Sequence, residues 1–158
     1  MPLYRFHIDA TAPPQAVTER LRRAVRKRPG FGEYFRTMWS SRSSGGPPFI
    51  GSVQDHSFRI RRDIRYRNSF LPLVWGHIVP TPTGARVIVT MFMPPFTLVF
   101  ILFWLGIVGR GALMVKSASP AILWGMFIFG IALCIGGFIP EAVKAKRLLS
   151  TIVLDSPR

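Results

Sequence analysis

Few side chains of this chain have the types and spacing that catalysis or metal binding needs. The three histidines lie far apart and form no pair with metal-ligand spacing: His7, His56 and His77. The acidic residues of the first 93 positions are scattered among a larger number of cations: Asp9, Glu19, Glu33, Asp55 and Asp63. The single cysteine, Cys134, lies within a long apolar run. We therefore predict no catalytic residue, no metal and no cofactor, and interpret the chain as non-enzymatic.

Arginine is the residue type whose spacing is most informative. From position 58 apolar residues alternate with cations, which are Arg59, Arg61, Arg65 and Arg67. A period of two predicts a strand that is buried on one face and cationic on the other. A predicted helix after position 11, ended by Pro29 and Gly30, adds further cations on its polar side, among them Arg20, Arg23 and Lys27. We take these seven residues as a candidate site for an anionic partner.

Charge limits the kind of partner. The net charge is +14, and residues 1–93 carry most of this excess. Such a surplus favours an anionic lipid surface, an acidic protein or a nucleic acid. Nucleic acid is the least favoured of these, because the alternation places Phe58 and Tyr66 on the buried face, away from the arginines.

Two further segments are candidate sites. Aromatic and apolar residues recur at helical spacing in one of them: Phe31, Tyr34, Phe35, Met38 and Trp39. They are typical of core packing, of an aromatic wedge at a membrane interface, or of the wall of an apolar pocket. The second segment contains Asn68 and Ser69, which are expected to form a polar turn and to satisfy nearby backbone amides. A polar contact beside the arginine face is its functional interpretation.

Two uncharged runs, residues 87–109 and 117–140, indicate that the chain that carries these candidate residues is anchored in a membrane. Each can form a helix of ~20 residues, as a hydrocarbon core of ~30 Å requires. With only residues 110–116 between them, they predict a transmembrane hairpin, and we expect Pro140 to end its second helix. Small residues four apart predict close helix packing, within the hairpin or in a homo-oligomer: Ala121, Gly125, Ala132 and Gly136.

Orientation follows from the distribution of cations. The N-terminus has no apolar run of the secretory kind, and cations flank the domain side of the hairpin, including Arg86, Lys144 and Arg147. Arg110 and Lys116 lie in the short connecting loop. We therefore expect a multi-pass protein of the bacterial inner membrane with both termini in the cytoplasm.

The predicted fold class is α+β, with a small antiparallel sheet and one or two helices. We divide the chain into a basic cytosolic domain (residues 1–93), the transmembrane hairpin (94–140) and a short C-terminal amphipathic helix with a tail (141–158). The predicted function is a membrane-anchored protein whose basic domain binds an acidic partner or an anionic lipid surface. The alternative is a membrane-anchored domain that binds a small apolar ligand.

Several stretches carry a resemblance to a known family. They are Phe49-Ile-Gly-Ser-Val, Phe58-Arg-Ile-Arg-Arg and Ile64-Arg-Tyr-Arg-Asn-Ser-Phe-Leu-Pro. The chain resembles a family of small bacterial integral membrane proteins of uncharacterised function that end in a two-helix hairpin. The start Ala12-Pro-Pro-Gln-Ala-Val17 is also similar to the helix-grip (START-like) fold, which implies a sheet and a long helix around an apolar cavity. Neither resemblance implies a specific activity.

Overall fold

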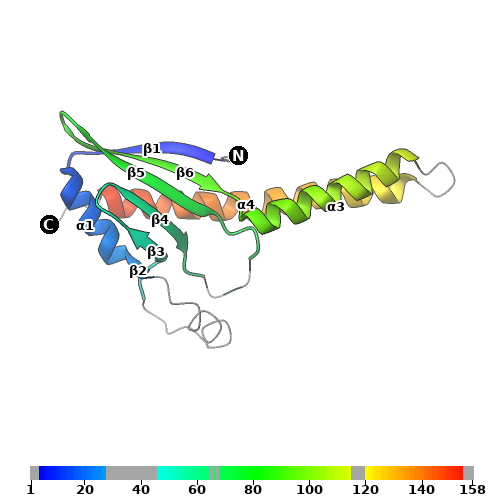
Figure 1. Ribbon diagram of the computed structural model, residues 1–158, viewed down its shortest axis with the longest axis horizontal. Coiled ribbons are helices and arrows are strands. Elements are labelled where there is room, and N and C mark those ends of the chain that lie inside the picture. The colour runs from blue at the N-terminus through cyan, green and yellow to red at the C-terminus, as the bar shows by residue number, and fades with distance from the viewer. Residues whose placement is uncertain (1–3, 28–45, 65, 67, 115–119, 155–158) are drawn as a thin grey trace.

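A computed structural model describes residues 4–27, 46–64, 66, 68–114 and 120–154. Its elements in chain order are β1 (Tyr4–Ala10), α1 (Pro14–Ala24), β2 (Val25–Lys27), β3 (Phe49–Val53), β4 (Ser57–Arg62), β5 (Leu73–Thr81), β6 (Gly84–Phe92), α3 (Pro95–Met114) and α4 (Pro120–Leu154). The fold class is α+β, as the sequence predicts. The strands and α1 form a sheet domain at one end of the molecule, and α3 with the first half of α4 extends from it (Figure 1).

The sheet is larger than predicted. It has six strands in the order β1-β6-β5-β4-β3-β2, and it is mixed because β2 pairs parallel with β3. The sixth strand arises where helix was expected: α1 ends at Ala24, and Val25–Lys27 adopts extended structure beside Phe49–Gly51. Val25 is β-branched and joins the sheet edge, where strand pairing satisfies its backbone. Helix α1 begins directly after Pro13, and no side-chain hydrogen bond caps its first turn.

One face of the sheet holds the core. Period-two burial in β5 and β6 places Val74, Ile78, Val87 and Val89 on this face. Two helices cover it: α1 through Val17 and Leu21, and the second half of α4 through residues one helical turn apart, which include Ala142, Ala145, Leu149 and Val153. No described helix packs on the opposite face, and in Figure 1 the sheet lies in front of α4.

Helix α4 continues through Pro140. The predicted helix end at this residue is therefore wrong. The C-terminal amphipathic helix predicted after it is present as far as Leu154, but it is continuous with the second helix of the hairpin. Proline removes one backbone N–H and leaves the carbonyl four residues earlier without its usual donor. Both halves of the helix are nevertheless held by packing, the first against α3 and the second against the sheet domain. Tertiary contacts thus keep the axis continuous from the hairpin into the sheet domain.

The hairpin consists of two helices that are long and apolar enough to cross a membrane. The two helices pack closely at Gly109 of α3 and Gly130 of α4. An added Cβ at Gly109 would lie 3.2 Å from the Phe127 side chain, and one at Gly130 would lie 3.2 Å from the Leu105 side chain. The predicted packing residues are on another face. Ala121, Gly125, Ala132 and Gly136 are all exposed, with nothing within 4 Å of an added Cβ at either glycine. Their predicted role in packing within the hairpin is wrong, and oligomer contact through them stays a prediction.

Candidate functional site

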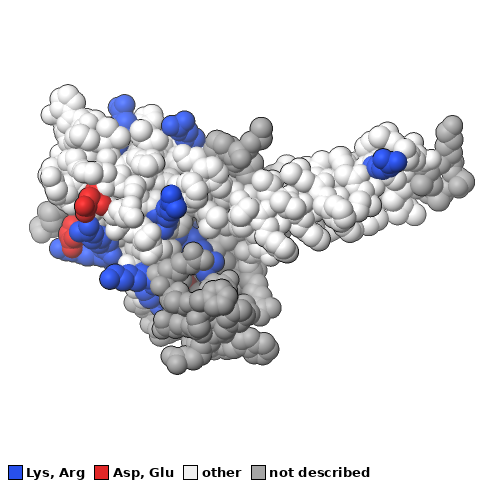
Figure 2. All heavy atoms as spheres, viewed as in Figure 1, with Lys and Arg blue, Asp and Glu red and all other residues white. Residues whose placement is uncertain are grey.

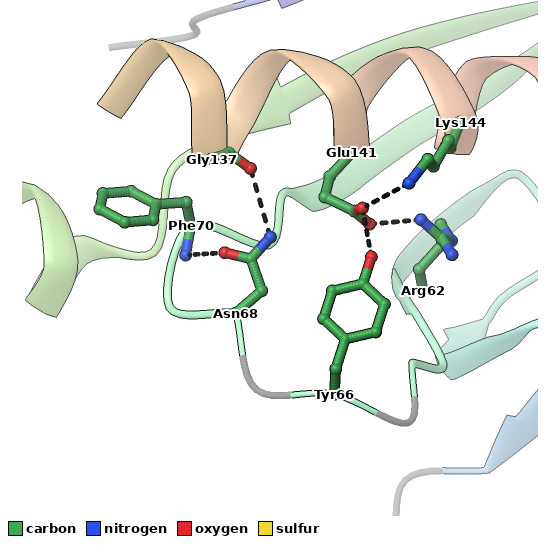
Figure 3. A network of polar contacts seen from close by, with 7 residues as sticks. All are labelled: Arg62, Tyr66, Asn68, Phe70, Gly137, Glu141 and Lys144. Carbon is green, nitrogen blue, oxygen red and sulfur yellow. Dashed lines mark hydrogen bonds and ion pairs between the residues drawn. The ribbon is translucent and has the colours of Figure 1, made fainter. Parts of the chain in front are cut away.

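A buried carboxylate marks the point where the hairpin meets the sheet domain. Glu141, one residue after Pro140, is only 3% exposed. Arg62 at the end of β4 and the phenol of Tyr66 both donate to it, and Lys144 Nζ lies 3.3 Å from its Oε1 (Figure 3). Burying a carboxylate is costly unless it is paired and hydrogen-bonded. Three donors from two segments of the chain meet that condition here.

The electrostatic surroundings keep Glu141 ionised. Burial raises the pKa of its carboxyl, but the hydrogen bond from Tyr66 and the charges of Arg62 and Lys144 outweigh burial, so that the pKa is lowered below its ordinary value of 4.5. With these partners Glu141 links helix α4 to the segment at the end of β4.

The polar turn at Asn68 and Ser69 forms the second half of the junction. Asn68 Nδ2 donates to the carbonyl of Gly137 at 3.2 Å, and Asn68 Oδ1 accepts from Phe70 N at 2.9 Å (Figure 3). The hydroxyl of Thr97, in the first turn of α3, donates to the carbonyl of Ser69 at 2.8 Å. One short loop therefore contacts both helices of the hairpin.

Close packing at Gly137 completes this loop contact. An added Cβ at Gly137 would lie 2.5 Å from Cδ2 of Phe70, so that only glycine allows the phenyl ring to rest on the helix. The hydrogen bonds and the packing together fix the hairpin relative to the sheet domain.

The face of the sheet opposite α1 and α4, on which no described helix packs, is the second candidate site. Cross-strand register places Ser52, Arg59, Trp75 and Thr90 side by side on β3, β4, β5 and β6. The next row carries Ser57, His77, Ile88 and His7. Figure 2 shows that cations lie over the sheet domain, whereas the hairpin is almost uncharged.

A hollow of about 320 Å³ lies on this face, and hydrogen-bonding side chains dominate its lining: Ser52, Gln54, Ser57, Arg59, Trp75 and His77. The guanidinium carbon of Arg59 is 4.6 Å from the centroid of the Trp75 ring, and the Phe92 ring lies 4.9 Å away on the same tryptophan. Such cation–π contact holds the guanidinium in one position while leaving its N–H groups available for an acceptor. Below, we refer to this feature as the Arg59 hollow.

The predicted arginine face is only partly within the described structure. Arg59 and Arg61 lie on the open face, as the alternation predicts, and Arg61 has a further interaction. Strand β4 ends at Arg62, and Arg65 and Arg67 lie outside the described residues. Tyr66 was expected on the buried face and is 51% exposed, because the chain leaves the sheet after β4 and brings its hydroxyl to Glu141.

The remaining predicted cations do not join this face. Arg20 donates to the carbonyl of Val153 at 2.8 Å, and Arg23 pairs with Glu19 at 3.5 Å, both on α1 at the far side of the sheet. Lys27 is exposed on the short edge strand β2. The predicted helix and strand cations therefore belong to separate surfaces.

Other predictions cannot be compared with the structure. The aromatic segment, with Phe31, Tyr34, Phe35, Met38 and Trp39, lies outside the described residues. Within the described ranges no cluster of three potential metal ligands is present.

Two residues of these sites escaped the sequence analysis. Glu141 is the only acidic residue between positions 64 and 154, directly after an apolar run, and this isolation is a signal that could have identified it. Trp75 alternates with buried neighbours in β5, but its position beside Arg59 depends on strand register.

No known protein family matches this chain, and neither a curated protein nor a solved structure shows significant similarity to it. Function must therefore be inferred from the described side chains themselves.

Proposed function

We propose that this chain is a non-enzymatic membrane protein, anchored by its two-helix hairpin, whose open sheet face binds an acidic segment of a protein partner. The anchor consists of α3 and the apolar first half of α4, and the Arg59 hollow binds a carboxylate of the partner. The proposed location is a bacterial inner membrane with both termini in the cytoplasm.

Exposure of the hairpin supports the anchoring role. The candidate spans have mean hydropathies of 2.0 and 2.3, and only 11% of each is buried inside the protein. A core helix of a soluble protein would be largely buried, whereas a lipid-facing helix exposes its apolar side chains. Residues such as Phe96, which is 85% exposed, have no described protein partner to cover them.

The orientation of the sheet favours a protein partner over a lipid surface. Strands β5 and β6 run obliquely across the sheet domain toward the base of the hairpin (Figure 1). A hairpin that crosses the bilayer therefore directs the open face sideways into the aqueous phase, and only the end of the sheet near Leu73 and Phe92 approaches lipid headgroups.

The single observation that carries the proposal is the Arg59 hollow. Its guanidinium is fixed over Trp75 and is surrounded by serine, glutamine and histidine side chains that can donate to a carboxylate. Trp75 contacts Arg59 and Phe92 and stays 43% exposed, so that stacking of a nucleic-acid base on it is an outcome that the experiment below distinguishes. We choose an acidic protein segment as the partner because the lining supplies several hydrogen-bond donors for a carboxylate.

A direct binding experiment tests this proposal. The full chain is placed in nanodiscs of neutral phosphatidylcholine, and binding of fluorescent poly-glutamate is measured by anisotropy. Replacing Arg59 and Arg61 by glutamine is expected to weaken binding several-fold. The matched control, Arg22→Gln with Arg23→Gln, removes two charges from α1 and should weaken it much less.

Three outcomes contradict the proposal. Equal losses in the two double variants would indicate a dependence on net charge alone. Tighter binding of single-stranded DNA than of poly-glutamate would favour a nucleic-acid partner. Binding to phosphatidylglycerol vesicles that depends on Arg59 would favour a lipid surface.

A further inference from the structure

A second hollow lies at the base of the hairpin, on the side of β1. It has a volume of about 320 Å³, and its lining is mainly apolar, with Tyr4 and Met93 on one wall and Cys134, Ile135, Phe138, Ile139, Ala142 and Val143 of α4 on the other. This volume is at the lower end of the range of about 300–1,000 Å³ that is usual for ligand sites. We call this feature the hairpin groove.

The groove crosses the level at which a bilayer changes from hydrocarbon to headgroups. Residues 120–139 of α4 extend for about 30 Å at a rise of ~1.5 Å per residue, which equals the thickness of the hydrocarbon core. Ile135 and Ile139 therefore lie in the hydrocarbon region, and both are about half exposed. Ala142 and Val143 lie just beyond Pro140, so that the groove leads from the hydrocarbon toward the sheet domain.

A cation lies at the headgroup end of the groove. Lys146 Nζ is 3.2 Å from Tyr4 Oη, and it lies 5.7 Å and 5.2 Å from the ring centroids of Tyr4 and Phe6. It is six residues beyond Pro140, or about 9 Å along the helix. The backbone of Lys146 therefore lies just outside the headgroup layer, which is roughly 5–7 Å deep. Because helix side chains lean toward the N-terminus of their helix, the lysine side chain extends back toward that layer.

The charge of Lys146 has no acidic partner among the described residues. Glu141, the acidic residue nearest to it on α4, is already bound to Arg62, Tyr66 and Lys144. Lys146 makes its described contacts with aromatic rings and a phenol hydroxyl. An ammonium group in this setting attracts an anion, and a phosphate oxygen is the anion that the headgroup region supplies.

We infer that the hairpin groove binds one anionic phospholipid of the leaflet on the sheet-domain side. The phosphate lies against Lys146 Nζ and the Tyr4 hydroxyl, and one acyl chain follows Val143, Ile139 and Ile135 into the hydrocarbon. The inference depends on membrane insertion of the hairpin and is independent of what the open sheet face binds. The groove and the Arg59 hollow share no residue.

Cys134 offers a built-in reporter, because it is the only cysteine of the chain and lines the groove. The purified full chain in mild detergent is treated with N-ethylmaleimide, and the rate of alkylation is measured without lipid, with phosphatidylglycerol and with phosphatidylcholine. We expect phosphatidylglycerol to slow alkylation several-fold at concentrations at which phosphatidylcholine has little effect.

Variants test the headgroup contact. Lys146→Met is expected to abolish the difference between the two lipids, and Lys146→Arg to retain it. Arg147→Met removes a neighbouring exposed cation that does not border the groove, and it should behave like the unchanged protein. Thermal unfolding of each variant in detergent shows whether the fold is intact.

The inference is overturned if both lipids protect Cys134 equally, since the groove then selects acyl chains without regard to charge. It is also overturned if neither lipid protects, or if Arg147→Met removes the selectivity as fully as Lys146→Met. Loss of poly-glutamate binding in the Arg59 variants, with lipid selectivity retained, separates this site from the proposed partner site.

Discussion

At the scale of single residues, Glu141 links the hairpin to the sheet domain. It is buried, and it joins Arg62 of β4, Tyr66 of the following loop and Lys144 of its own helix. Removal of one partner from a buried pair leaves the other charge uncompensated and costs about 3–5 kcal/mol when burial is complete. Because the Arg62 side chain is 16% exposed, removing its charge is expected to lower the free energy of unfolding by less, up to about 3 kcal/mol.

The contribution of Glu141 should depend on pH in a defined direction. Its pKa in the folded protein is lowered below 4.5 by Tyr66, Arg62 and Lys144 acting against burial. A lowered pKa means that its stabilisation is fully present above about pH 4.5 and is lost as the pH falls through the folded-state value. We therefore expect the difference in unfolding free energy between the unchanged protein and Glu141→Gln to be constant above pH 5 and to shrink below pH 4.5.

Thermal or denaturant unfolding in detergent, followed by circular dichroism at several pH values, measures this difference. The other carboxyl groups, including Asp9 with its pKa lowered by the hydrogen bond from Arg86, titrate in both proteins and cancel. A difference that grows toward acidic pH would show that Glu141 is not ionised in the fold.

Residue type and spacing along the chain predict some single residues of these sites and not others. The isolated pair Asn68 and Ser69 was selected correctly as a polar turn, because side chains of this type bond to nearby backbone groups. Glu141 was missed, since its partners Arg62 and Tyr66 are more than 70 positions away in sequence. Local propensity carries no information on partners at that distance.

At the scale of elements, local rules failed where tertiary packing opposed them. Pro140 was expected to end a helix, yet α4 continues because α3 and the sheet hold both of its halves. The period-two pattern of β5 and β6 was interpreted correctly, because burial on one face requires that alternation. The parallel strand β2 has no such pattern and was interpreted as helix.

Alanine substitutions at two adjacent glycines of α4 are expected to change the stability of the protein in opposite directions. An added Cβ at Gly136 meets open space, whereas one at Gly137 collides with the ring of Phe70. Gly136→Ala is therefore expected to stabilise the protein by up to about 1 kcal/mol, through helix propensity alone. Gly137→Ala should destabilise it, because Phe70 or the loop must move away from the helix.

The midpoint of thermal unfolding in detergent, measured side by side, checks this pair. Phe70→Ala in the background of Gly137→Ala provides the control, since it removes the colliding ring and should lessen the effect of the added methyl group. Equal effects of the two alanines would mean that the Asn68–Leu71 loop does not pack on α4.

At the scale of the whole molecule, the first and last described elements belong to the same domain. Strand β1 begins the described chain, and α4 ends it, and both belong to the same domain, with Lys146 in contact with Tyr4. Composition alone revealed the two apolar runs and hence the hairpin. It could not reveal that the chain returns to its own first strand, because this pairing connects residues 142 positions apart.

The contact between α4 and β1 predicts on which side of the membrane each part of the chain lies. In a background of Cys134→Ala, single cysteines replace Thr83 at the tip of the β5–β6 turn, Thr151 near the end of α4 and Arg110 near the far end of α3. A membrane-impermeant maleimide should label positions 83 and 151 from the same side and position 110 from the other, because the hydrocarbon core separates the sheet domain from the hairpin tip. In inverted inner-membrane vesicles, positions 83 and 151 are expected to react and position 110 only after detergent is added. Labelling of all three positions from one side would contradict the transmembrane hairpin. Labelling of positions 83 and 151 from opposite sides would contradict a single domain that contains both the sheet and the end of α4.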